Sequence, residues 1–226
     1  MRDAYTDRLD SIRDDLVAMS RLVGTAVSRA TEALLNGDAA LAEQVISDDA
    51  EVDRFRAEIE ERSFELLSLQ NPVAGDLRML IASLRMVSEF ERMGDLSVHV
   101  AKIARLRVPE IAVPEELEPT ISRMAAIAEV MVGRVGHIIA DRDATGARQL
   151  EEADEEMDRL RRTSFRELLG SDWKHGVEPA VDIALLGRYY ERIADHAVSI
   201  ARRVVFLVTG ESSPLHDVSD VTRRSS

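Results

Sequence analysis

Acidic side chains stand four residues apart in four segments of this chain that match one another two by two. The pairs are Asp49 with Asp53, Glu91 with Asp95, Asp154 with Asp158, and Glu191 with Asp195. Residues at positions i and i+4 share one face of an α-helix, so each pair would place two like charges side by side. Because a bound cation relieves such repulsion, the spacing indicates cation binding.

The position of these acids on their helices decides between a cation site and a solvated surface. An isolated acidic pair usually belongs to a charged, solvent-facing stripe with basic neighbours, and such neighbours are present: Arg54, Arg92, Arg159 and Arg192. At 100° per residue, however, Glu91 and Asp95 fall on the apolar stripe of their helix. Asp49 and Asp53 fall at the edge of theirs.

We therefore expect two cation sites, each formed where two antiparallel helices meet. Their ligands would be Asp49, Asp53, Glu91 and Asp95 in the first, and Asp154, Asp158, Glu191 and Asp195 in the second. A set made only of carboxylates favours hard or borderline cations over thiophilic ones. The identity of the metal stays open among Mg²⁺, Ca²⁺, Mn²⁺, iron and Zn²⁺.

Patterns typical of catalytic centres are missing from the sequence. There is no glycine-rich phosphate loop, no nucleophile elbow and no cysteine. The Glu-x-x-His spacing of ferritin-like di-iron enzymes is also absent. His99 and His196 do not occupy matching places, and we interpret both as helix-surface histidines. These observations favour an interaction protein that is not an enzyme, with a ferritin-like oxidase or storage protein and a purely structural bundle as alternatives.

Breaks in the sequence delimit the elements that must position the acids. Prolines at 72, 109, 114, 119, 179 and 214, together with Gly37-Asp38, leave long uninterrupted segments between them. They predict six helices: Ala4–Asn36, Asp38–Leu69, one from Pro72 to Arg107, Glu116–Ala140, one capped by Asp143 that runs to Leu169, and one from Glu178 to just before Gly210. The residues from 211 to 226 are Ser-rich and predicted to be disordered.

The chain contains an internal repeat. At an offset of 100 residues the block from Phe90 to Val98 matches the block from Tyr190 to Val198, and at an offset of 105 residues Asp38 to Arg54 matches Asp143 to Arg159. The change of offset requires a deletion in the second copy, which we place in the connection before the last helix. The repeat predicts an all-α fold of two pseudo-symmetric three-helix bundles, spanning 1–108 and 120–210, with a connector at 109–119 and a tail at 211–226.

Composition limits the partners. The net charge of −13 argues against nucleic acid and anionic membranes and favours cations or basic protein surfaces. The charged N-terminus is unlike a secretory signal, and no apolar run is long enough to span a bilayer. We therefore expect a cytoplasmic protein without a transmembrane segment.

The repeated blocks resemble the PhoU family of bacterial phosphate-transport accessory and regulatory proteins. The resemblance rests on Phe90-Glu91-Arg92-Met93-Gly94-Asp95, on Tyr190-Glu191-Arg192-Ile193-Ala194-Asp195-His196-Ala197, and on Asn71-Pro72-Val73-Ala74-Gly75-Asp76-Leu77-Arg78. It covers roughly residues 5 to 209. Ala194 stands where the family motif often has Gly, which still leaves room for close helix approach.

The resemblance implies more than the residues do by themselves. It implies metal clusters on the acidic motifs of at least some members and frequent homodimers. It also implies a negative regulator of phosphate uptake and of phosphate-starvation signalling. Such a protein would relay the state of a phosphate ABC transporter to a membrane histidine kinase.

Overall fold

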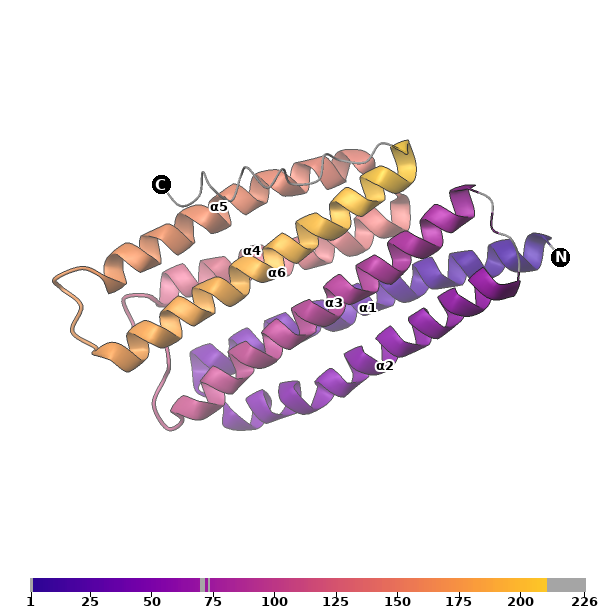
Figure 1. Cartoon of the computed structure of the whole chain (residues 1–226). Helices are drawn as coiled ribbons and strands as arrows, with labels where there is room; N and C mark the ends of the chain where they lie inside the picture. Colours follow the sequence, from indigo (N-terminus) through magenta and orange to yellow (C-terminus); the bar gives the residue numbers. More distant parts are fainter. Residues whose placement is uncertain (1, 70–71, 73, 211–226) are drawn as a thin grey trace.

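Six long helices make up the fold (Figure 1). The structure, a computed structural model, describes residues 2–69, 72 and 74–210. The helices are α1 (Arg2–Asn36), α2 (Ala39–Leu69), α3 (Ala74–Arg107), α4 (Glu118–Asp141), α5 (Ala144–Leu168) and α6 (Val177–Thr209). The six helices predicted from the sequence are confirmed, and the predicted disorder of the tail lies outside the described residues.

Local interactions favour the starts of α2 and α5 and the ends of α1 and α6. The Asp38 carboxylate accepts a hydrogen bond from the Leu41 N–H at 2.9 Å, and the Asp143 carboxylate accepts two, from Thr145 N and Gly146 N. These contacts satisfy amides that the first turn of a helix leaves unpaired. Gly37 and Gly210 follow α1 and α6 with φ of 63° and 73°, the left-handed conformation that glycine adopts without strain.

Two three-helix bundles pack against each other along their length. α1 and α3 contact α2 in the first bundle, while α4 and α6 contact α5 in the second. The bundles meet through α1 against α4 and α3 against α6, so α2 and α5 lie on opposite outer edges (Figure 1). This arrangement confirms the all-α fold of two pseudo-symmetric bundles. Within the described residues, no helix is both long and apolar enough to cross a membrane.

A few buried polar contacts join the two bundles. The hydroxyls of Thr31 on α1 and Tyr190 on α6 are both buried and lie 2.9 Å apart. Between α3 and α6, Glu89 receives hydrogen bonds on its two oxygens from His196 Nδ1, at 2.7 Å, and from Arg203. Burial would raise the pKa of Glu89, but these hydrogen bonds outweigh it and hold the pKa below its ordinary value.

His196 is therefore buried, and its interpretation as a surface histidine was wrong. Only 8% of the residue is exposed, because its side chain enters the interface between the bundles. His99 is exposed as expected and stacks on Tyr189 across the same interface, with ring centroids 5.3 Å apart. The two histidines differ because the contact of α3 with α6 covers one position and leaves the other at the rim.

The deletion in the second copy shortens a helix rather than a connection. α2 has 31 residues and α5 has only 25, whereas α3 and α6 are nearly equal at 34 and 33. The connection from α5 to α6 spans residues 169–176 and is longer than the one from α2 to α3 at 70–73. Placing the deletion in that connection was wrong. A consequence is that α5 covers less of the start of α6.

Candidate cation sites on paired acidic helices

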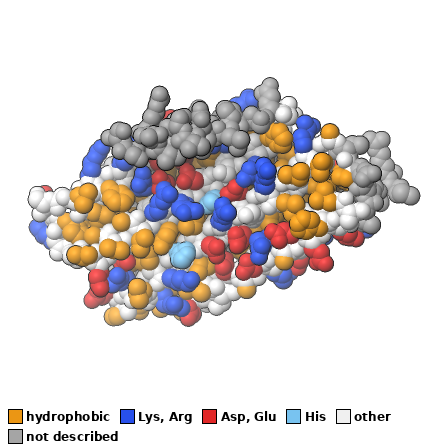
Figure 2. Space-filling view, viewed as in Figure 1, with side chains coloured by type: hydrophobic (Ala, Val, Ile, Leu, Met, Phe, Trp, Pro, Cys, Tyr) orange, Lys and Arg blue, Asp and Glu red, His pale blue; other side chains and the backbone are white. Residues whose placement is uncertain are grey.

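The first acidic set lies where α2 packs antiparallel against α3. Figure 2 shows acidic side chains gathered along this seam. Asp49 is half-buried and Glu91 partly buried, while Asp53 and Asp95 are exposed. The two helices thus bring together acids that are about forty residues apart in sequence, as the pattern predicted.

Burial and mutual repulsion make it unfavourable for all four carboxyl groups of this set to be ionised at once. Burial, followed by the neighbouring carboxylates of Asp95, Asp53 and Glu91, raises the pKa of Asp49 to about 6. The pKa of Glu91 is also raised by burial and by Asp95, although Arg56 opposes the shift. Groups with raised pKa values bind a proton more readily than isolated carboxylates, and they would bind a cation for the same reason.

A glycine makes the close approach of the two helices possible. A Cβ atom added to Gly94 would lie 3.0 Å from Oδ1 of Asp49 and 3.3 Å from Cγ1 of Val52. Both distances are shorter than comfortable van der Waals separations. The glycine of the Phe90–Asp95 block therefore allows the Asp49 carboxylate to lie against the α3 backbone.

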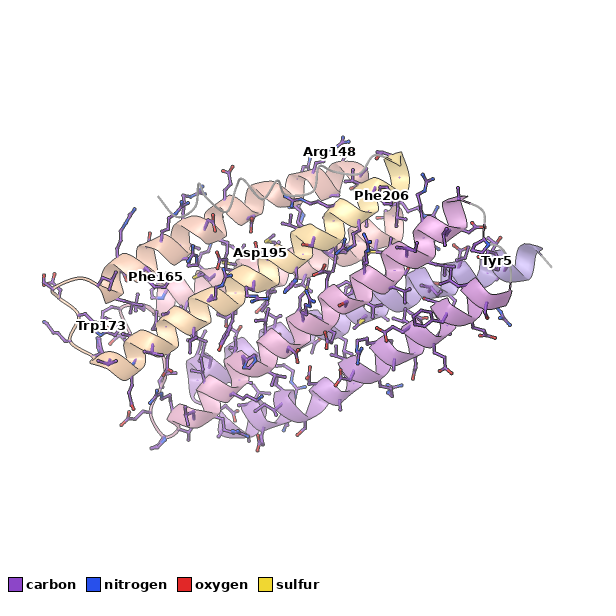
Figure 3. All side chains as sticks on the ribbon, in the orientation of Figure 1. Tyr5, Arg148, Phe165, Trp173, Asp195 and Phe206 are labelled. Carbon is purple, nitrogen blue, oxygen red and sulfur yellow. The ribbon has the colours of Figure 1, made fainter. Side chains whose placement is uncertain are left out.

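The second acidic set is arranged differently. Glu191 on α6 is 4% exposed, and its two oxygens face two arginines. Arg161 Nε on α5 lies 3.0 Å from Oε1, and Arg188 Nη1 donates a hydrogen bond to Oε2. Asp154 and Asp158 are partly buried, and Asp195 is exposed near the middle of α6 (Figure 3). Glu191 is therefore already neutralised by the protein itself.

One substitution between the repeats accounts for much of the difference. At the offset of 105, Arg161 matches Arg56, so each copy carries an arginine three residues after its second aspartate. The sequence analysis did not single out Arg56 and Arg161, although their match at the offset of 105 could have identified them. At the offset of 100, Arg188 matches Ser88. The first copy therefore lacks the second arginine, and in that copy Glu91 keeps a raised pKa.

The two sets differ in how well they fit a cation. Among the described residues, no group of three or more His, Asp or Glu side chains is already arranged to hold a metal ion. In the first set, Asp53 and Asp95 are exposed and can reorient by changing rotamer. The first set thus fits a cation in charge and access. Glu191 does not fit while two arginines occupy its oxygens.

Fold and site together define a class of protein. It consists of two packed three-helix bundles whose second and third helices carry acid pairs, and no helix among the described residues could span a membrane. The chain belongs to the PhoU family, since the PhoU domain model matches residues 16–104 and 121–204, once in each bundle.

Individual relatives agree with this assignment. The chain is 47% identical over 210 residues to the phosphate-specific transport system accessory protein PhoU homolog 2 of Mycobacterium tuberculosis, covering 93% of this chain and 99% of that protein. It is 46% identical to homolog 1 of Mycobacterium leprae, with 93% and 95% covered. The crystal structure of PhoU from Pseudomonas aeruginosa superposes with a TM-score of 0.86 at 30% identity, covering 92% of this chain and all of that one.

Proposed function

We propose that this protein is a negative regulator of phosphate uptake and of phosphate-starvation signalling. The observation that carries the proposal is the 47% identity, along nearly the full length of both chains, to a protein named as an accessory of the phosphate-specific transport system. In this role the protein relays the state of a phosphate ABC transporter to a membrane histidine kinase. It works by association rather than by turnover, in the cytoplasm and as a homodimer.

Deletion of the gene tests this function. The deletion strain should express phosphate-starvation genes, and take up phosphate faster, in medium rich in phosphate. Re-expression of the wild-type chain should restore repression. Unchanged reporter expression together with unchanged phosphate uptake would exclude the regulatory role.

We further propose that Asp49, Asp53, Glu91 and Asp95 bind a divalent or iron-type cation. The support is the raised pKa of Asp49 and Glu91, which burial and neighbouring carboxylates cause and which Lys102 and Arg56 oppose only in part. A bound cation would screen these carboxylates from one another and draw α2 toward α3. The set of Asp154, Asp158, Glu191 and Asp195 is the pseudo-equivalent candidate, and we expect it to bind more weakly because of Arg161 and Arg188.

The sign of one mutational effect distinguishes a cation site from a solvated surface. In chelator, Asp49→Asn should raise the free energy of unfolding at pH 7, because it removes an acid whose pKa of about 6 lies above its ordinary value. After allowance for solvent screening we expect about 1 kcal/mol. With Mn²⁺ present the same change should lower stability, because a ligand is lost.

The pH dependence of the free energy of unfolding, measured in chelator, provides a control for Asp49. Only the folded state gains a proton at Asp49 as the pH falls through about 6, so the wild-type protein should become more stable relative to Asp49→Asn between pH 7 and pH 4. Urea denaturation measures both quantities. If Asp49→Asn is neutral in chelator and in Mn²⁺ alike, the acids form an ordinary charged surface.

A further inference from the structure

Lysine is rare in this chain, and one of its two lysines lies beside the first acidic set. Of the 29 Lys and Arg residues, only Lys102 and Lys174 are lysine. Lys102 belongs to α3 and is exposed. At the offset of 100 residues it matches Arg202, which is only partly exposed. A lysine at this place is therefore a feature of the first copy alone.

Lys102 shares the face of α3 that carries the two acids of the set. At 100° per residue it falls between Glu91 and Asp95, about 20° from each. It follows Asp95 by seven residues, which is about 10 Å along the helix axis. The acids and the lysine thus form one stripe along α3.

The register of α2 against α3 brings Asp49 to the end of the set where Lys102 lies. Gly94 of α3 is opposite Asp49 of α2, and Arg105 of α3 pairs with Glu43 of α2. Lys102 stands between Gly94 and Arg105, so it faces the stretch of α2 from Asp49 to Glu43. The positive charge of Lys102 accordingly opposes the rise in the pKa of Asp49.

Other acids in this stretch of α2 already have partners. Glu43 pairs with Arg105 and Asp48 pairs with Arg29, each at 2.6 Å. Lys102 and Asp49 make no ion pair of 4 Å or less among the described residues. The ammonium of Lys102 is therefore not committed to another carboxylate, and Asp49 is the acid left for it to approach.

An ammonium suits a counter-ion that has to leave. It is a compact, strongly hydrated charge on a flexible stem, whereas a guanidinium holds carboxylate oxygens through a rigid set of donors. In the second set, Arg161 and Arg188 hold both oxygens of Glu191 in this way. The first set has, next to Asp49, a basic group that can approach and withdraw.

We propose that Lys102 is a mobile counter-ion of the first acidic set, whose ammonium approaches the Asp49 carboxylate when no cation is bound and moves out to solvent when a divalent cation binds. This role of Lys102 rests on the proposed cation site and adds a residue that controls its affinity. A divalent cation carries twice the charge of the ammonium and displaces it, whereas Na⁺ and K⁺ lack this advantage. Lys102 thereby favours divalent over monovalent cations.

Titration of Lys102→Met with Mn²⁺ tests the proposal, because methionine keeps an unbranched side chain and removes the charge. Isothermal titration should show about fivefold tighter binding at the first set than in the wild-type protein, since the ion no longer meets a like charge. High salt should reduce the difference. Lys102→Arg should bind Mn²⁺ more weakly than the wild type, because a guanidinium stays on the carboxylates.

Lys174→Met is the matched control. Lys174 follows Trp173 in the connection from α5 to α6, in the other bundle (Figure 3). This variant loses the same charge from the chain as a whole but should bind Mn²⁺ as the wild type does.

Thermal denaturation tests the state without metal. In chelator, Lys102→Met should lower the melting temperature, because Asp49 loses a nearby positive charge. The difference should shrink or reverse in saturating Mn²⁺. In an Asp49→Asn background, Lys102→Met should no longer lower the melting temperature in chelator.

Paramagnetic broadening by Mn²⁺ shows where the ion lies. Reductive methylation with ¹³C-formaldehyde labels Lys102, Lys174 and the amino terminus, because the chain has no other amine. Substoichiometric Mn²⁺ should broaden the Lys102 signal strongly and the Lys174 signal far less. The Lys102→Arg variant identifies the Lys102 signal by its loss.

The remaining outcomes separate this proposal from the ones on which it rests. Equal Mn²⁺ affinity of Lys102→Met and the wild type would overturn the role of Lys102 and leave the cation site intact. No Mn²⁺ binding to either protein would overturn both, while the regulatory function would still be decided by the gene deletion. Broadening of the Lys174 signal without the Lys102 signal would place the ion away from the first set and overturn the proposal as well.

Discussion

At the scale of single residues, the contrast between Ser88 and Arg188 separates the two acidic sets. Both stand three residues before the glutamate of their repeat, which on a helix places them on the same face as that glutamate. Arg188 donates a hydrogen bond to Glu191, and Arg161 approaches the other oxygen. Serine cannot supply a charge. In the first set Arg56 offsets the carboxylates only in part, and this is the charge that the proposed cation would neutralise.

Replacing Arg188 by serine and Ser88 by arginine should reverse which acidic set binds a cation more tightly. Arg188→Ser should increase cation binding at the second set, because Glu191 loses one of its two arginines. Ser88→Arg should reduce binding at the first set by placing a positive charge beside Glu91. Isothermal titration with Mn²⁺ in each variant measures the stoichiometry, which should rise for Arg188→Ser and fall for Ser88→Arg.

Arg162→Ser is the matched control, because it removes an exposed arginine of α5 that makes no ion pair among the described residues. Its titration should match that of the wild-type protein. An unchanged stoichiometry in both exchange variants would show that the arginines do not control cation binding.

At the scale of the elements, the spacing between α2 and α3 depends on the absence of a side chain at Gly94. Any Cβ there meets Asp49 and Val52 of the facing helix, so larger side chains must separate the two helices. The repeat carries Ala194 at the matching position, and the second bundle accommodates it without exposure. The close approach of the Asp49 carboxylate to the α3 backbone at Gly94 is thus a property of the first bundle.

Gly94→Val should destabilise the protein by about 2 kcal/mol and weaken cation binding at the first set, because overpacking moves α2 away from α3. Gly133→Val is the control. Gly133 also lies within a helix, α4, but nothing lies within 4 Å of a Cβ built there. That variant should change stability by less than about 1 kcal/mol and leave binding intact. Thermal or urea denaturation and Mn²⁺ titration measure the two effects, and equal effects of the two variants would contradict the packing argument.

At the scale of the whole molecule, a polar network between the bundles joins them more specifically than apolar packing alone. Glu89 accepts hydrogen bonds from His196 and Arg203 in an environment that excludes most water. Residues 89 and 196 are far apart in sequence, so their meeting requires the bundles to be docked in one register. Buried charge of this kind is costly to leave unpaired.

Glu89→Gln should therefore lower the free energy of unfolding by about 3 kcal/mol, since it removes the charge that His196 and Arg203 face. Glu43→Gln is the control, because Glu43 pairs with Arg105 at 2.6 Å on the surface, where its side chain is 57% exposed. We expect that change to cost less than about 0.5 kcal/mol. Urea denaturation measures both, and similar values would show that the interface does not depend on its polar network.

The sequence by itself determined the helices, the repeat and which acids lie together in the first acidic set. Proline positions, the caps at Asp38 and Asp143 and the i, i+4 acid pairs are local or periodic features, and such features indicate where a helix begins, ends and turns its apolar face. The repeat then indicated that each bundle would bring two acid pairs together. The raised pKa of Asp49 agrees with that expectation for the first bundle.

Only the tertiary structure decided which side chains meet across helices. Periodicity places His196 on a face of α6 but does not say that α3 covers this face, so its contact with Glu89 was not foreseen. The same holds for the two arginines that neutralise Glu191, which come from different helices. The shorter α5 exposes the start of α6 and creates an apolar groove beside Trp173. These outcomes depend on the relative lengths and docking of packed helices, and those are set by the sum of many contacts between residues distant in sequence.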